Sequence, residues 1–184
     1  NTTGFDVAYC SYHKMHMEEN KMKDTNKSTN VLVTGGTGFL AGWTIRKLLE
    51  KGYSVGTTVR SMKKSEKIVN MLHYVLHVAL PLGGNNHEDP TLIPIAKNGV
   101  ENVFSAAIRV GVKKIVMTSS EAANYPDKKD TNPSIDETFW TDMDNKWITN
   151  YQRSKIIDEK TAWEMIGKQS HTKLATILPG AILG

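Results

Sequence analysis

Hydrophobic and polar positions follow different patterns on the two sides of residue 30. Residues 1–29 are rich in Asn, Lys, Thr and Ser and show little apolar periodicity. We therefore expect a disordered or loosely ordered N-terminal tail over this stretch. From residue 30 onward, short apolar runs alternate with stretches of helical periodicity. The pattern predicts one folded domain over residues 30–184.

The domain is predicted to begin with a strand, a helix and a second strand. Residues 31–33 form a short apolar run that is typical of a strand buried in a parallel sheet. A helix follows, because apolar side chains recur at helical spacing at Ala41, Ile45, Leu48 and Leu49. Gly52 stands where a left-handed residue would end this helix. Residues 53–60 predict the second strand.

A further strand and a core helix are predicted downstream. Residues 74–79, with the sequence YVLHVA, resemble a buried strand. The segment 89–112 has apolar side chains at helical spacing at Val100, Val103, Phe104, Ala107 and Ile108. Gly111 is placed to end this helix. Alternating strands and helices of this kind indicate an α/β fold.

A glycine-rich turn joins the first strand to the first helix. Gly35 permits a tight turn, and Gly38 lets the backbone approach a pyrophosphate. The N-terminus of the helix then faces the phosphates with free N–H groups and a partial positive charge. A strand, glycine turn, helix and strand within about thirty residues are typical of a dinucleotide-binding unit. The alternative is a tight turn with no ligand.

The end of the second predicted strand carries cations where an NAD-binding protein would place an acid. Arg60 is followed by Lys63, Lys64 and Lys67. A carboxylate here would bind the ribose hydroxyls of NAD, whereas cations suit the 2′-phosphate of NADP. The sequence therefore favours NADP(H), the alternative being the solvated, basic start of a helix.

A tyrosine and a lysine are spaced to share one face of a helix. Tyr151 precedes Lys155 by four residues, so both side chains can point into one site. A cation beside a phenol favours the phenolate and lowers its pKa, which suits proton transfer. The spacing also occurs by chance on many helices, so the pair alone is weak evidence for a catalytic site.

Composition and charge narrow the class of protein. The chain has 184 residues, of which 39% are hydrophobic and 23% charged, as in soluble globular proteins. The sequence has no apolar run of membrane-spanning length and no secretory signal, so we expect no membrane partner. A single cysteine agrees with a reducing compartment, and we expect a cytoplasmic protein. The net charge is +4, and the Lys and Arg residues are scattered, which gives no support for a nucleic-acid partner.

Two groups of candidate metal ligands are present. Cys10, His13 and His16 have ligand-like spacing, but no fourth ligand follows at a familiar distance. His73 and His77 repeat at a helical spacing, yet the residues between them resemble a strand. We therefore expect no metal site.

Six segments carry a resemblance to a known superfamily. They are, in order, TGGTGFLA, TVR, HVALP, VKKIVMTSS, YQRSK and LPGAILG. Their order resembles that in the extended short-chain dehydrogenase/reductases, and most of all in the dihydroflavonol-reductase-like group, which includes cinnamoyl-CoA reductases and microbial ketone and aldehyde reductases. In that family a serine, a tyrosine and a lysine reduce a carbonyl with hydride from a nicotinamide. The resemblance implies a Rossmann-like, doubly wound parallel sheet.

The resemblance also implies roles for individual residues. The catalytic set falls on Ser120, Tyr151 and Lys155, with Ser119 as the alternative serine. Lys155 would hold the nicotinamide ribose and lower the Tyr151 pKa. The implied cofactor contacts are Gly35, Gly38, Phe39, Leu40, Arg60, Lys67, Val78, Ala79, Leu80, Tyr151, Lys155, Pro179, Gly180, Ala181 and Ile182. Glu121 departs from the small residue usual after the serine.

Two segments usual in the family are short or missing. Between Arg60 and Tyr74 there are only 13 residues, where the family has two helices and a third strand. The chain also stops at Gly184, before the region that closes over the substrate. We therefore expect an incomplete Rossmann domain whose second strand, residues 53–59, is an exposed edge open to self-association. A helix over about residues 61–72 would lie on the face opposite the helix after Gly38.

These features together predict an NADP(H)-dependent reductase of a small-molecule ketone or aldehyde. For the 184-residue chain itself we expect weak cofactor binding and negligible turnover. One alternative is a non-catalytic nucleotide-binding or interaction module derived from such a reductase. Another is a nucleotide-sugar epimerase or dehydratase, which Arg60 disfavours because those enzymes commonly hold NAD.

Overall fold

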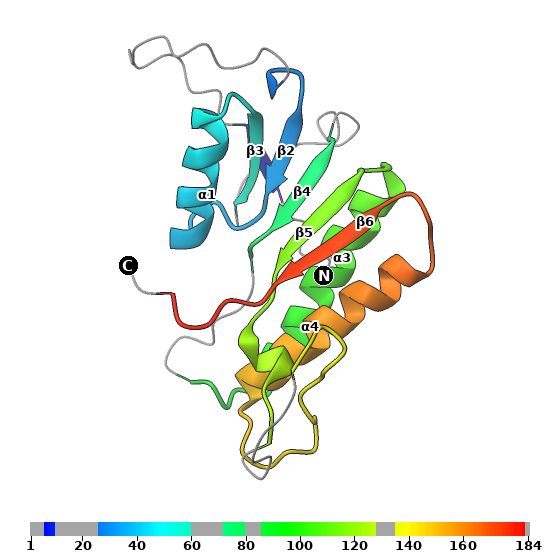
Figure 1. Ribbon diagram of the computed structural model, residues 1–184. Coiled ribbons are helices and arrows are strands. Elements are labelled where there is room, and N and C mark those ends of the chain that lie inside the picture. Colours follow the sequence, from blue (N-terminus) through cyan, green and yellow to red (C-terminus); the bar gives the residue numbers. More distant parts are fainter. Residues whose placement is uncertain (1–5, 10–25, 60–71, 80–85, 128–134, 183–184) are drawn as a thin grey trace.

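A six-stranded sheet forms the centre of the molecule. The computed structural model describes residues 6–9, 26–59, 72–79, 86–127 and 135–182 (Figure 1). The strand order is β1-β3-β2-β4-β5-β6. The strands are β1 (Asp6–Tyr9), β2 (Asn30–Val33), β3 (Ser54–Val59), β4 (Tyr74–His77), β5 (Lys114–Thr118) and β6 (Lys173–Ile177).

Five of the strands are parallel and make up a doubly wound sheet. Strands β3, β2, β4, β5 and β6 pair in parallel with their neighbours. Helix α1 (Phe39–Glu50) lies on one face, and α3 (Leu92–Arg109) and α4 (Asn150–Gly167) lie on the other (Figure 1). β3 is added on one side of β2, and β4, β5 and β6 follow on its other side, as in a Rossmann fold. The predicted fold class is confirmed.

Strand β1 covers the sheet edge that was predicted to be open. It pairs antiparallel with β3, with Asp6 opposite Val59 and Tyr9 opposite Gly56. The prediction that residues 53–59 form an exposed edge is therefore wrong, because the backbone of β3 pairs with β1 on that side. β1 lies where the Rossmann order places the third strand, but it runs in the opposite direction. The predicted domain boundary at residue 30 stays a prediction.

Alternate side chains of β2 supply the two cores. Val31 and Val33 pack with Ala41 and Val55 beneath α1. Leu32 points to the other face and packs into the larger cluster beneath α3, which includes Phe104. Successive side chains of a strand face opposite sides of a sheet, so one short apolar run serves both layers.

The ends of the helices follow local signals in the sequence. Gly52 (φ 81°) and Gly111 (φ 73°) adopt left-handed conformations just after α1 and α3, as predicted for helix stops. Helix α4 begins with a capping box, in which Thr149 accepts from the Gln152 N–H and the Gln152 side chain accepts from the Thr149 N–H. This cap fixes where α4 starts, one residue before Tyr151.

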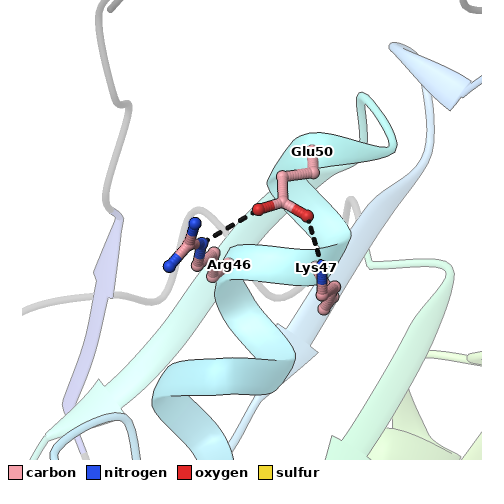
Figure 2. A network of polar contacts seen from close by, with 3 residues as sticks. All are labelled: Arg46, Lys47 and Glu50. Carbon is pink, nitrogen blue, oxygen red and sulfur yellow. Dashed lines mark hydrogen bonds and ion pairs between the residues drawn. The ribbon is translucent and has the colours of Figure 1, made fainter.

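The outer surface of α1 carries a small ion-pair network. Figure 2 shows the Glu50 carboxylate accepting from Arg46 Nε at 2.9 Å and from Lys47 Nζ at 2.8 Å. These bonds lower the Glu50 pKa. Exposed pairs of this kind add little to stability. Trp43 lines shallow depressions on the same surface, one of which reaches Phe39 at the start of α1.

Two predictions concern residues that the structure does not describe. They are the helix expected near residues 61–72 and the ligand-like group at positions 10–16. Among the residues that the structure does describe, no group of three or more His, Cys, Asp and Glu is arranged to hold a metal ion. No described helix combines the length and apolar character needed to cross a membrane.

Candidate functional site

Four segments meet at the edge of the sheet where the parallel strands end. Thr34 follows β2, Val78 follows β4, Ser119 follows β5, and residues 178–182 follow β6. Because the carboxyl ends of parallel strands share one edge, this is where open α/β sheets bind ligands. Each segment contains residues that the sequence predicted to be functional.

The glycine turn after β2 is held against the neighbouring segments so closely that side chains do not fit. Gly35 has a positive φ of 75°, and a Cβ placed on it would lie 3.0 Å from the Cβ of Ala79. A Cβ on Gly36 would overlap the Thr57 hydroxyl. The Gly38 N–H donates to the Gly35 carbonyl at 2.8 Å. The structure thus brings the predicted residues Gly35, Gly38 and Ala79 together.

The Thr34 hydroxyl connects the glycine turn with the segment after β4. It accepts hydrogen bonds from the Val78 and Ala79 N–H groups, both at 3.0 Å, and lies 3.0 Å from His77 Nδ1. Since it already accepts two donors, its own proton points to His77 Nδ1. A neutral His77 therefore carries its proton on Nε2. Burial, and to a smaller extent the Lys155 charge, lowers the His77 pKa to about 4.

Tyr151 and Lys155 lie one turn apart at the start of α4. Lys155 is buried, and its Nζ lies 5.3 Å from the centroid of the half-buried Tyr151 ring. The Tyr151 N–H donates to the His87 carbonyl at 2.8 Å, and the two rings meet edge to face. The segment before α3 therefore fixes the position of this tyrosine. The predicted proximity of the two side chains is present.

The charges around Tyr151 differ from those that the family resemblance implies. Burial raises the Tyr151 pKa, and the carboxylate of Asp158 raises it further. Burial lowers the Lys155 pKa, whereas Asp158 raises it. The expectation of a lowered Tyr151 pKa is therefore wrong for this structure. The physical reason is that burial and a nearby carboxylate both favour the neutral phenol.

The two candidate serines have different partners. Ser119 is buried, and its hydroxyl donates to the Glu159 carboxylate at 2.5 Å. Ser120 is half-buried, and its oxygen accepts from the Ala122 N–H at 3.2 Å, which caps the 3₁₀ helix η2 (Glu121–Asn124). The Ser119 proton is thus committed to Glu159, while Ser120 accepts and keeps its own proton to donate. This difference is compatible with Ser120 rather than Ser119 as the catalytic serine, and that choice stays a prediction.

Glu121 lies against the segment that follows β6. Its N–H donates to the Pro179 carbonyl at 3.1 Å. Its carboxylate comes within 3.0 Å of the place where a Cβ on Gly180 would stand. Gly180 therefore leaves room for Glu121. A carboxylate is thus placed next to residues 179–182, the segment predicted to lie beside the nicotinamide.

Comparison with known proteins identifies the family. Residues 31–182 match the family described as the NAD dependent epimerase/dehydratase family. The chain belongs to this family. The match spans the glycine turn, the serines, Tyr151, Lys155 and the segment after β6. The predicted membership among the extended short-chain dehydrogenase/reductases is confirmed.

The relatives agree with the dihydroflavonol-reductase-like resemblance. Cinnamoyl-CoA reductase 2 of Medicago truncatula is 29% identical over 185 residues, covering 84% of this chain and 54% of that protein. Anthocyanidin reductase of Arabidopsis thaliana is 31% identical over 194 residues, covering 85% and 56%. Among solved structures, Gre2 from Candida albicans has a TM-score of 0.69 at 27% identity, covering 83% and 57%. The chain spans about half the length of the relatives it matches.

Most of the predicted cofactor contacts lie at this edge of the sheet, and three lie outside the described residues. Arg60, Lys67 and Leu80 belong to the latter group. Phe39 starts α1 with 59% of its surface exposed and meets Trp43 edge to face. The individual roles of these residues in binding and catalysis stay predictions.

Several residues of the site were missed by the sequence reasoning. Thr34 and His77 hold the turn together, although both stand inside the quoted motifs. Asp158 and Glu159 lie on the buried face of α4 beside Lys155. The signal for these two carboxylates was their spacing, because Asp158 follows Lys155 by three residues and Glu159 follows it by four, which places both near Lys155 on the helix.

Proposed function

We propose that this chain forms the cofactor-binding part of an NADP(H)-dependent reductase that converts a ketone or aldehyde into an alcohol. The observation that carries the proposal is the placement of Tyr151 and Lys155 at the same sheet edge as the glycine turn. The reductase relatives add support, since their names describe reduction of cinnamoyl-CoA and anthocyanidin.

The residues of the turn suit the pyrophosphate of a dinucleotide. Gly35 and Gly36 lie too close to Ala79 and Thr57 for side chains, so the bend after β2 consists of backbone alone at these two positions. Helix α1 starts at Phe39 with Gly38 as its N-cap, so no side chain covers the first N–H groups. Those groups and the helix dipole favour an anion. Arg60 and Lys67, by sequence, would supply the charge for the 2′-phosphate of NADP.

The residues near α4 suit proton transfer to a carbonyl oxygen. A bound nicotinamide supplies the hydride in this chemistry. Tyr151, whose pKa is raised, stays protonated at neutral pH and donates its proton to the carbonyl oxygen. Ser120 donates a hydrogen bond to the same oxygen, which stabilises the charge that develops there. Lys155 places a cation near the phenolate that Tyr151 becomes.

Replacement of Tyr151 by Phe tests the proposal. Tyr151→Phe removes the proton donor but keeps the ring against His87, so we expect single-turnover oxidation of NADPH with a carbonyl substrate to fall by about 10² to 10⁴. Tyr125→Phe is the matched control, because Tyr125 is half exposed and lies outside the proposed site. The assay uses this chain with NADPH in excess of the protein. Equal rates in Tyr151→Phe and the native protein would falsify the assignment.

A further inference from the structure

Asp158 is a buried acid for which the structure provides no hydrogen-bond donor. It lies on α4, three residues after Lys155 and seven after Tyr151, and its exposed fraction is 0%. Neither carboxylate oxygen has a hydrogen-bond partner among the described residues. A buried carboxylate without a partner is costly in its charged form, so its charge must be shared or neutralised.

The groups that act on Asp158 come from α4 itself. Asp158 interacts electrostatically with Lys155, with Glu159 and with Tyr151. Glu159 has partners of its own, since it accepts from the Ser119 hydroxyl and from Trp163 Nε1. The Lys155 ammonium is thus the cation that can balance the Asp158 carboxylate.

The elements packed around this face supply no second cation to Asp158. The buried side chains of α3, the helix beside α4, are all apolar. From β4, His77 interacts with Lys155, and its low pKa keeps it neutral near pH 7. The buried alanines of η2 add no charge, and Glu121 at its start is exposed. Among the described residues, Lys155 is therefore the one cation that acts on Asp158, and the Glu159 carboxylate is the other charge beside it.

We propose that Asp158 is a positioning residue of the Tyr151–Lys155 site, which offsets the Lys155 charge and holds Tyr151 in its protonated, proton-donating form. The pair has two arrangements with the same net charge. In one, Lys155 is an ammonium and Asp158 a carboxylate; in the other, Lys155 has released its proton and Asp158 has taken one up, leaving an amine and a carboxylic acid. In both, Tyr151 meets a pair without net charge.

The directions of the pKa changes support this arrangement. Burial raises the Asp158 pKa, against Lys155, which lowers it. Burial lowers the Lys155 pKa, against Asp158, which raises it. Asp158 also raises the Tyr151 pKa, after burial as the larger cause. Loss of the carboxylate should therefore lower the pKa of Tyr151 and of Lys155 together.

The consequence for chemistry rests on the proposed reductase function. A site that keeps its tyrosine protonated favours giving a proton to a carbonyl over taking one from an alcohol. Removal of the Asp158 charge should therefore increase alcohol oxidation relative to carbonyl reduction near pH 7. Each pH unit by which the Tyr151 midpoint falls raises the phenolate fraction there about tenfold.

Titration of Tyr151 in the full chain tests the proposal without requiring turnover. The absorbance of tyrosinate is followed against pH in native protein, Asp158→Asn and Glu164→Gln. Each protein is measured with Tyr151 and again with Tyr151→Phe, and the difference between the two curves gives the titration of Tyr151. Glu164 is the matched control, because it is an exposed acid on α4. We expect a lower Tyr151 midpoint in Asp158→Asn and no change in Glu164→Gln. Equal midpoints in all three, or equal shifts in both variants, would overturn the proposal.

A second measurement titrates Asp158 itself in the native chain and uses a variant only to assign its signal. Carbon NMR of labelled aspartate carboxyls should show one group, absent in Asp158→Ala, that titrates well above the ordinary pH range of an aspartate. Titration of Asp158 within that ordinary range would overturn the proposal. If the expected shifts occur but Tyr151→Phe and native protein oxidise NADPH equally fast in a single turnover, the reductase function fails and the Asp158 inference stands. Turnover without the expected shifts would overturn the Asp158 inference and leave the reductase function standing.

Discussion

The stability of the protein should fall as the pH is lowered, and His77 should account for a defined part of that loss. The His77 side chain is 2% exposed, and burial holds its pKa at about 4, compared with 6.5 for an ordinary histidine. The unfolded chain therefore binds a proton between these values while the folded chain does not. The stabilising contribution is fully present above pH 6.5 and is lost as the pH falls toward about 4.

The size of the effect follows from the two pKa values. Each pKa unit corresponds to about 1.4 kcal/mol. A fall from 6.5 to about 4 therefore makes His77 worth up to about 3 kcal/mol of unfolding free energy across this range. Asp158, whose pKa is raised, acts in the opposite direction, because its folded form gains a proton first as the pH falls. A variant is therefore needed to isolate His77.

His77→Asn provides that comparison. The Asn oxygen stands near the position of Nδ1 and can accept the Thr34 hydroxyl, but the residue does not titrate. The smaller side chain loses its contact with Phe104, so the variant should be less stable at pH 7. Urea unfolding is measured from pH 4 to 7 in native protein, His77→Asn and His171→Asn, an exposed histidine. The stability gap between native protein and His77→Asn should narrow by up to about 3 kcal/mol at the acidic end. A constant gap would refute the reasoning.

Two further predictions concern the cofactor site. Gly36→Ala should lower the unfolding free energy by about 1–3 kcal/mol, since its Cβ would overlap the Thr57 side chain; Gly42→Ala, whose Cβ meets nothing within 4 Å, should be neutral or stabilising in the same urea assay, and equal effects at both glycines would contradict this. Arg60→Asp should reduce the calorimetric affinity for NADP⁺ more than for NAD⁺, whereas Arg109→Asp, at the end of α3, should leave the ratio unchanged. An unchanged ratio in Arg60→Asp would show that Arg60 does not contact the 2′-phosphate.

The parts of the fold that sequence could predict depend on local signals. Gly52 and Gly111 ended their helices as expected, because left-handed backbone favours glycine wherever it occurs. The separation of Tyr151 and Lys155 by one helical turn placed them together before any tertiary contact was known. These predictions needed only the geometry of a single element.

The parts that sequence could not predict depend on tertiary packing. Strand β1 lies in a stretch with little apolar periodicity, and it pairs with the edge of β3. Asp158 stands among charged residues on α4, so only the packing of that helix shows that this acid is buried and Glu164 is not. The raised pKa of Tyr151 follows first from its own burial and then from the nearby Asp158 carboxylate. A motif fixes which side chains meet, whereas burial fixes their charges.

The division of β2 between two cores makes the length of this segment a stricter requirement than its composition. Val31 and Val33 face α1 while Leu32 faces α3, and conservative apolar exchanges would preserve both packings. An inserted or deleted residue would turn each side chain to the opposite face. It would also move Thr34 away from Val78 and Ala79, and with it the glycine turn. Among natural or engineered variants, this segment should accept substitutions far more readily than changes in length.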